Sequence, residues 1–166
     1  MERNPAMPVG SGIATPAVQL LLFSMHGQRF AFDLAGVERV VRAVALTVVP
    51  GLPPAIRGIF SFHGRIVPVG DLHQRLGFPR RDPRLDDWLV VLRTSGRFLG
   101  VLLDGAGEVL ACPTSTIEPS ETVFRESHLT RGIARVNDDV VLIQDLAKFL
   151  SIEETLALDG ALDAHA

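Results

Sequence analysis

Short apolar runs broken by polar turn residues occur along most of the chain, and they predict many short β-strands. Two runs separated by a glycine-containing turn are typical of a β-hairpin. The predicted hairpins turn at His26-Gly27, at His63-Gly64 and across residues 94–96, and their strands cover residues 19–24 with 29–33, 56–62 with 65–69, and 88–93 with 98–103. The pattern therefore predicts an all-β fold with a few short helices, of the kind found in small barrels.

The chain nearly repeats itself. The stretch from Gly58 to Leu72 returns 74 positions later as Gly132 to Leu146, with apolar residues in matching places. Asp71 and Asp145 occupy the same place in the two copies. A weaker correspondence precedes each copy, between residues 28–40 and 96–110. Self-similarity at a fixed spacing indicates repeated supersecondary units, so we expect two related β units in tandem.

Three short helices are predicted from their capping residues. Asp71 is placed as the N-cap of a helix that ends at Gly77, with Gln74 at the reciprocal position of a capping box. Asp145 begins the matching helix of the second copy, through Leu150. Ser151, with a glutamate three residues later, forms a capping box for a terminal helix, which we expect to fray at residues 159–161.

Composition shifts suggest the limits of the folded part. Residues 1–17 carry three prolines, two glycines and no apolar period, so they are expected to form a flexible tail. The folded domain is expected over residues 18–152, as two β subdomains at 18–80 and 88–150 that a charged, proline-bearing connector, residues 79–87, joins. Residues 153–166 complete the chain as a C-terminal helix and tail.

The charge and cysteine content exclude several classes of protein. Sixteen basic and 19 acidic side chains give a net charge of −3, which disfavours a general binder of nucleic acid or of anionic membranes. A local basic patch is possible at Arg80, Arg81 and Arg84. One cysteine cannot form an internal disulfide, and no apolar run nears the roughly 18 residues of a membrane span. We therefore expect an intracellular, cytoplasmic protein.

Few residues suggest catalysis. The closest approach to a ligand cluster is His63, Asp71 and His73, but their spacing matches no metal motif. The roles of turn residue, helix cap and helix-surface residue explain the three better. Cys112 lies between apolar residues and a proline, as an inert buried thiol does. No phosphate-binding or dinucleotide-binding glycine motif occurs, so no cofactor is predicted. An enzyme that uses Cys112 or His63 remains an alternative, as does a nucleic-acid-binding pair of barrels.

The run from Ile56 to Leu72, IRGIFSFHGRIVPVGDL, closely resembles the CheW-like domain family. Members of that family typically show Gly-Val-x-Asn-Leu-Arg-Gly-x-Ile-Val-Pro-Val-x-Asp-Leu at this place. The resemblance continues through residues 100–104 and 132–150 and covers about residues 18–152. It implies two intertwined SH3-like, five-stranded β-barrels with an apolar seam between them, and no enzymatic activity.

The resemblance also implies partners. CheW-like adaptors bridge the cytoplasmic tip of a chemoreceptor helical hairpin to the regulatory domain of a CheA-type histidine kinase, a domain with the same fold. The implied function is therefore a scaffold in bacterial chemotaxis signalling, recruited to membrane receptor arrays. A close alternative places the same scaffold in a pilus-motility or other chemosensory-like pathway.

Four residues match family positions linked to receptor contact: Val37, Arg57, Gly58 and Val109. For the valines, an inward-facing position in the core is an equally ordinary role. Kinase contacts are expected on the barrel ends and on the loop at residues 117–124.

One position departs from the family pattern. His63 stands before the hairpin Gly64 where the family usually has arginine. An imidazole with a pKa of about 6.5 replaces a group that is always charged and has five donors. If that arginine organises contacts to a partner, His63 does not reproduce them at neutral pH, although Arg65 could supply charge from the other side of the turn.

Overall fold

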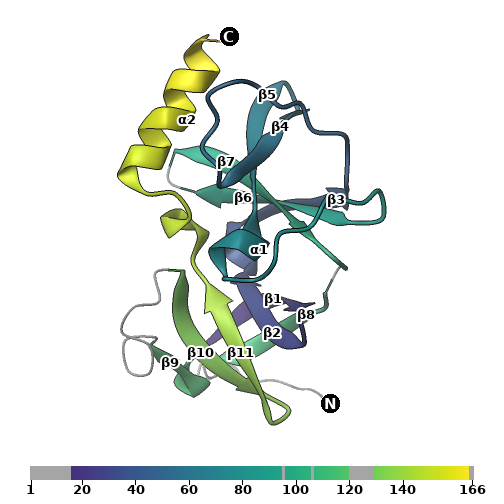
Figure 1. The fold of residues 1–166 in the computed structure, drawn as a ribbon. Helices are drawn as coiled ribbons and strands as arrows, with labels where there is room; N and C mark the ends of the chain where they lie inside the picture. The colour runs from purple at the N-terminus through teal and green to yellow at the C-terminus, as the bar shows by residue number, and fades with distance from the viewer. Residues whose placement is uncertain (1–15, 95, 106, 120–128, 165–166) are drawn as a thin grey trace, which may run out of the picture.

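The strands form two sheets, one above the other in the computed structural model (Figure 1). The structure describes residues 16–94, 96–105, 107–119 and 129–164, so residues 1–15 of the predicted tail and the part of the predicted kinase-contact segment beyond Pro119 lie outside the described residues. Within the described part, no helix is long and apolar enough to cross a membrane.

The six-stranded sheet has the order β8-β1-β2-β11-β10-β9, and its strands are β1 (Ala17–Met25), β2 (Gln28–Asp33), β8 (Val109–Pro113), β9 (Ile117–Pro119), β10 (Thr130–Val136) and β11 (Asp139–Gln144). The five-stranded sheet has the order β3-β6-β7-β5-β4, and its strands are β3 (Val37–Arg42), β4 (Ile56–Phe62), β5 (Arg65–Gly70), β6 (Trp88–Thr94) and β7 (Arg97–Leu103). The helical elements are η3 (Leu34–Gly36), α1 (Leu72–Arg75), η4 (Thr114–Thr116), η6 (Leu146–Lys148) and α2 (Ile152–Ala164). The predicted mostly β class with two sheets is confirmed, and the short β9 adds a sixth strand to one sheet.

The two sheets exchange strands between the halves of the chain. The β1-β2 hairpin belongs to the six-stranded sheet, whereas the rest of the first half, β3 to β5, belongs to the other. The second half mirrors this arrangement, because its β6-β7 hairpin joins the five-stranded sheet and β8 to β11 join the six-stranded one. The expected division into subdomains at residues 18–80 and 88–150 is therefore wrong for the sheets. Each is completed by a parallel pairing between halves, β2 with β11 and β7 with β5.

The internal repeat is visible in the register of the strands. Val69 pairs with Gly100 in the five-stranded sheet, and Ile143, 74 positions after Val69, pairs with Ala31 in the other. Both hairpins carry a register shift at equivalent places, between residues 56 and 58 and between residues 130 and 132. These matched irregularities support the interpretation of a duplicated unit.

The predicted hairpin turn at His63-Gly64 forms as expected. Both residues have positive φ, 50° and 77°, as the tight two-residue turns of β-hairpins require. The equivalent turn of the second copy uses Asn137 and Asp138, with φ of 50° and 68°. Asparagine and aspartate tolerate the left-handed conformation better than most side chains, so this turn forms without glycine.

The largest buried cluster lies between the sheets. It combines Phe32 of β2, Leu92 of β6 and Phe149 after η6, each at most 4% exposed, with other side chains of both sheets. Each sheet also has a smaller cluster of its own, around Ile143 in the six-stranded sheet and Leu89 in the five-stranded one. We call the shared cluster the seam. The apolar seam implied by the resemblance is present.

Helix α2 packs against the five-stranded sheet through Leu158 and Ala161, which are buried. The predicted capping box is confirmed, since the Glu154 N–H donates to Ser151 Oγ and the Ser151 N–H donates to Glu154 Oε1, both at 3.0 Å. The expected fraying at residues 159–161 is wrong, because the helix continues through Gly160 to Ala164. Its buried residues and an ion pair between Asp159 and Arg97 hold this turn in place.

Replacing Gly70 by alanine is expected to destabilise the fold. An added Cβ would lie 2.5 Å from the ring of Phe149, which is buried in the seam. Overpacking of this kind costs about 1–3 kcal/mol, measurable by denaturant unfolding. Gly105→Ala is the matched control, since a Cβ there meets open space. Equal stability of the two variants would contradict the close packing of Phe149.

Glu154 is expected to make stability depend on pH. Burial acts to raise the pKa of this carboxyl, but hydrogen bonds from Arg75 and Ser151 outweigh burial and hold the pKa below its usual value of 4.5. A depressed folded-state pKa contributes stability above the unfolded-state value, and that contribution disappears as pH falls through the folded-state value. Glu154→Gln keeps the cap oxygen but loses the charge. Its unfolding free energy should be below that of the wild type at pH 7, and the difference should shrink as pH falls below 4.5; a difference independent of pH would refute the ion-pair contribution.

Candidate interaction surfaces

Two edge strands, β3 and β8, flank the seam. Each ends the strand order of its sheet, so each has one edge without a neighbouring strand. Val37 lies opposite Leu92 in one sheet, and Val109 lies opposite Leu21 in the other. Leu92 and Leu21 are both members of the seam cluster. The two valines singled out from the sequence therefore lie at the two borders of the same apolar interface.

The two valines differ in exposure. Val109 is 51% exposed, as expected of a side chain on a contact surface. Val37 is partly buried and packs against the seam cluster, so it contributes to both the core and the border of the seam. The role of a core residue therefore fits Val37, and the role of a surface contact fits Val109.

The chain crosses between the sheets immediately before each edge strand. The first crossing is η3, whose N-cap Asp33 accepts a hydrogen bond from the Ala35 N–H at 3.0 Å. The second crossing leads from β7 to β8, and its position is fixed by a hydrogen bond from the Leu22 N–H to the Glu108 carbonyl at 2.8 Å. A Cβ on Gly107 would lie 1.0 Å from the Leu22 carbonyl oxygen, so only glycine allows this approach. These contacts position β3 and β8 relative to the seam.

Gly58 and Arg57, which match family positions linked to receptor contact, are buried and partly buried in the structure. Gly58 is buried, and a Cβ there would lie 2.9 Å from the Leu46 Cβ and 3.0 Å from the Thr47 carbonyl oxygen. The missing side chain lets Thr47 bridge to Ile59 through two backbone hydrogen bonds. The Arg57 side chain is 11% exposed. Any effect of these residues on a partner is therefore indirect, through the packing of β4.

Asp71 joins two structural roles. Its Oδ1 accepts from the Gln74 N–H at 3.1 Å, which confirms the predicted N-cap of α1. Its Oδ2 accepts from Arg57 at 3.3 Å and from Arg80 at 3.0 Å. The reciprocal half of the capping box is absent, because the Asp71 N–H donates instead to the Ala55 carbonyl. Asp145 plays the same part in the second copy, where its Oδ1 accepts from the Ala147 N–H, but the helix η6 that follows ends at Lys148.

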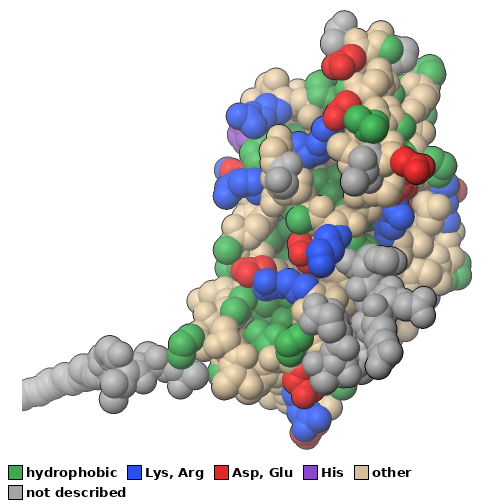
Figure 2. Space-filling model, turned by 90° about the vertical axis from the view of Figure 1, so that its left-hand side faces the viewer, with side chains coloured by type: hydrophobic (Ala, Val, Ile, Leu, Met, Phe, Trp, Pro, Cys, Tyr) green, Lys and Arg blue, Asp and Glu red, His purple; other side chains and the backbone are tan. Residues whose placement is uncertain are grey.

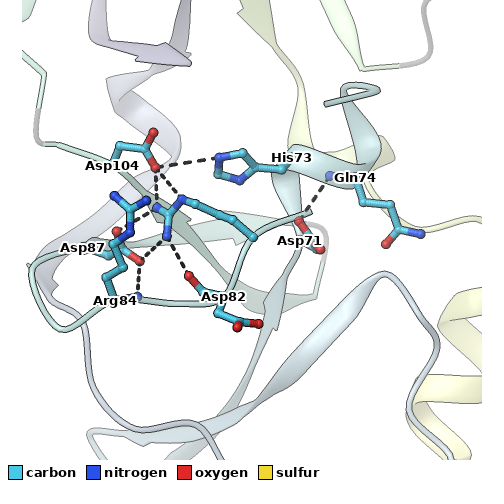
Figure 3. Close-up of polar contacts among 8 residues, drawn as sticks. Asp71, His73, Gln74, Asp82, Arg84, Asp87 and Asp104 are labelled. Atoms are coloured by element: carbon cyan, nitrogen blue, oxygen red, sulfur yellow. Dashed lines mark hydrogen bonds and ion pairs between the residues drawn. The ribbon is translucent and has the colours of Figure 1, made fainter. Parts of the chain in front are cut away.

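The charged connector is held by Arg81, whose partners are Asp87, just before β6, and Asp104, just after β7; Figure 3 shows these two carboxylates together. Arg81 hydrogen-bonds both oxygens of Asp87, at 2.7 and 3.0 Å, and also contacts Asp104. Asp87 is 1% exposed; burial acts to raise its pKa, but the Arg81 hydrogen bonds and the Arg84 N–H hold that pKa below its usual value. Of the three arginines of the suggested basic patch, Arg80 and Arg81 are paired with carboxylates, and Arg84 is exposed.

The histidines and the acidic cap do not converge. His73 is 6% exposed, not on the helix surface as expected, and its Nε2 faces Asp104 at 3.7 Å while Asp71 points toward Gln74 (Figure 3). Burial lowers the pKa of His73 and outweighs the nearby carboxylate. His63 lies exposed in the β4-β5 turn. Within the described residues, no three histidine, cysteine or acidic side chains form a metal-binding group.

Cys112 is a core residue. It is 3% exposed, and its Sγ lies 3.3 Å from Thr116 Oγ1 and 3.8 Å from the Pro113 carbonyl oxygen. These neighbours supply no general base for a thiol nucleophile. The geometry therefore gives no support to an enzyme based on Cys112 or His63.

Aromatic rings lie beside the hairpin turn that carries His63. The His63 ring lies 4.2 Å from the Phe62 ring, and the Arg65 guanidinium lies over Phe98 at 5.1 Å. In the second copy, Asp139 follows the turn as Arg65 does, and it pairs with Arg29 at 3.3 Å. Arg65 is therefore already engaged within the protein, which limits its use as a substitute for the missing arginine.

Charges of both signs are mixed on the surface. On the face shown in Figure 2, blue and red side chains lie next to one another, and no large region carries a single sign. A nucleic-acid-binding surface requires a concentrated positive field. The mixed charge agrees with the small net charge and gives no support to the nucleic-acid alternative.

Sequence reasoning missed an exposed apolar group near β4. Val44 is 45% exposed, Val48 75% and Ile66 56%. Val44 and Val48 lie on either side of Thr47, which bridges to β4, and Ile66 pairs with Ser61 of the same strand. For Ile66 the sequence did contain a signal, because consecutive apolar residues on a hairpin strand cannot all face one core.

Comparison with known proteins identifies the family. The family model described as the CheW-like domain matches residues 19–154. The chain is 24% identical to the chemotaxis protein CheW of Klebsiella aerogenes over 91% of this chain and 92% of that protein, and 25% identical to that of Thermotoga maritima over 86% and 92%. The solved scaffolding protein TtCheW from Thermoanaerobacter tengcongensis superimposes with a TM-score of 0.76 at 26% identity, covering 87% of this chain and 94% of that one. The chain therefore belongs to the CheW-like domain family and is a non-enzymatic scaffold of chemotaxis signalling.

Proposed function

We propose that this scaffold couples the cytoplasmic tip of a chemoreceptor to the regulatory domain of a CheA-type histidine kinase. The observation that carries the proposal is the position of the edge strands β3 and β8, which border one apolar seam from two sheets. The matched family region spans both sheets, so this border is part of the shared domain. Binding of this kind requires no reactive side chain. It would recruit the protein from the cytoplasm to membrane receptor arrays.

The receptor helix is proposed to lie along the seam border. Val109 offers an exposed apolar side chain, and the partly buried Leu34, Val37 and Val40 continue the apolar surface from the other sheet. An amphipathic helix places apolar side chains at every third or fourth position and fits such a border. Arg57 and Gly58 support this surface from inside, through the packing of β4.

The kinase is proposed to bind a different surface. Val48 and Ile66 are exposed apolar side chains near β4, the edge strand opposite β3: Val48 follows Thr47, which bridges to Ile59 of β4, and Ile66 of β5 pairs with Ser61. The exposed Val44 lies on the segment that leads from β3 to this bridge. Exposed apolar side chains that lie together mark protein contacts. Because β3 and β4 are at opposite edges of the sheet, receptor and kinase could bind at the same time, as coupling requires. Residues 117–124, of which Ile117–Pro119 form β9, are a second candidate for kinase contact.

The pathway follows from the relatives. Those compared above are named as chemotaxis proteins. This favours chemotaxis over the alternative of a pilus-motility or other chemosensory-like pathway. Identification of the kinase that co-purifies with the protein would distinguish these pathways.

Val109→Arg is expected to abolish receptor binding without unfolding the protein. The side chain is half exposed, so the unfolding free energy should change by less than about 0.5 kcal/mol. Affinity for a receptor-tip fragment, measured by surface plasmon resonance, should fall at least about tenfold, while affinity for the kinase regulatory domain stays unchanged. Val140→Arg on β11, 49% exposed, is the matched control. Unchanged receptor affinity in Val109→Arg would remove the proposed border from consideration.

Val37→Arg tests whether this side chain contributes to core packing as well as to receptor binding. Val37 is partly buried against the seam, so an arginine there should cost about 1–3 kcal/mol of stability as well as receptor binding. Thermal unfolding of the two valine variants in parallel would show this difference. If Val37→Arg were as stable as the wild type, the side chain would be a contact residue only.

His63→Arg is expected to strengthen coupling. The position is exposed in a turn, so the added charge reaches solvent or a partner without disturbing the core. Kinase activity in a reconstituted receptor–scaffold–kinase complex should rise above the wild-type level at neutral pH. Asn137→Arg, at the equivalent turn position with the same φ of 50°, is the control. An unchanged or weaker response in His63→Arg would show that the site has acquired another use.

A further inference from the structure

A cleft of about 310 Å³ opens where the two sheets meet, and it adjoins the proposed receptor border, because Gly36, which precedes Val37, and Leu92, which pairs with Val37, both line it. Its walls come from the ends of β2, β6 and β11, from η3 and from β10. Neither Val37 nor Val109 lines it. Its polar lining consists of Asp33, Arg93, Thr94, Arg131, Gln144 and Asp145. The volume is at the lower end of the range for small-ligand pockets, and several polar groups converge in it.

The charges in the cleft leave one carboxylate unpaired. Arg131 pairs with Asp33 at 3.0 Å, and Arg93 pairs with Glu38, so these four charges cancel. Asp145 has no basic partner among the described residues. One of its oxygens accepts from the Ala147 N–H at 3.1 Å, and the other is unpaired within the same part of the chain. The lining as a whole has two acidic and two basic side chains, and Asp145 is the one of these four without an ion-pair partner among the described residues.

The neighbouring Gln144 adds an unsatisfied acceptor. The residue is 3% exposed, and its Nε2 donates to Thr130 Oγ1 and to the Leu142 carbonyl, both at 3.1 Å. The carbonyl of Leu142 can only accept, so the orientation of the amide is fixed. Its Oε1 has no hydrogen-bond partner in the described structure. A buried acceptor without a donor is costly, and a bound donor would recover that free energy.

We propose that this cleft binds a guanidinium group. Gln144 and Asp145 both line the cleft, and each has an acceptor oxygen without a donor among the described residues. A guanidinium offers several N–H donors in one plane together with a positive charge, which suits adjacent neutral and anionic acceptors better than the single point charge of an ammonium. The group could belong to a small molecule or to an arginine side chain of a bound protein. The site lies next to the proposed receptor border at Val37, and none of Val44, Val48 and Ile66 lines it.

The test is an NMR titration of the full chain labelled with ¹⁵N. Agmatine serves as the small-molecule probe, and a capped Gly-Arg-Gly peptide represents a protein side chain. The proposal expects chemical-shift changes at the backbone amides of Gln144, Asp145 and Arg93 with at least one probe. A capped Gly-Gln-Gly peptide, which lacks the positive charge, should leave these amides unmoved.

Asp145→Asn provides the matched variant, because its side-chain oxygen can still cap η6 while the charge is lost. The dissociation constant should rise at least about tenfold, as expected when a charged hydrogen bond becomes neutral. Asp163→Asn, an exposed position on α2 with the same change in net charge, should bind as the wild type does. Agmatine binding would identify a small-molecule site, and binding of the peptide alone would identify a site for a partner's arginine. The absence of shifts at the cleft with both probes at about 10 mM, or equal affinity in Asp145→Asn, would overturn the proposal.

Discussion

Burial of the seam is the constraint on which the other features depend. Neither sheet covers both of its own faces, and each leaves large apolar side chains, such as Phe32 and Leu92, that only the other sheet can remove from water. Full burial of one such side chain contributes about 1.5–3 kcal/mol. The crossings at η3 and at residues 104–108 hold the sheets in contact. The borders of the seam thereby become fixed surfaces whose apolar side chains can be offered to a partner.

A scaffold that works by contact places different demands on its residues from those an enzyme would make. The carboxyl groups with lowered pKa values have structural roles. Asp87 holds the connector through Arg81, and Glu154 holds α2 through Arg75. The buried His73 stands beside Asp104 without a hydrogen bond to it. These groups maintain the shape of the surfaces, whereas the candidate contacts, Val109 and Ile66, are apolar and exposed.

Local features of the fold could be predicted from the sequence because they depend on neighbouring residues. The His63-Gly64 turn, the Asp71 cap and the Ser151 capping box each arise within a few positions, and all three form. The resemblance carried by residues 56–72 then gave the family and the two-sheet fold. Strand partners could not be predicted from periodicity, which indicates the buried face of a strand but not the strand beside it. The expected division of the chain failed for that reason.

The candidate site was less predictable than the fold, since exposure depends on the whole tertiary structure. Nothing near Gly58 in the sequence reveals that Thr47 approaches it, and the charge of Arg80 does not reveal that Asp71 lies within 3.0 Å. The exchange of strands between the two halves of the chain also affects the nascent chain during synthesis on the ribosome. The β1-β2 hairpin emerges first, but its parallel neighbour β11 ends only at Gln144. Most of the polypeptide must therefore be translated before that hairpin edge is covered, so a nascent chain exposes an unpaired strand for nearly its entire elongation.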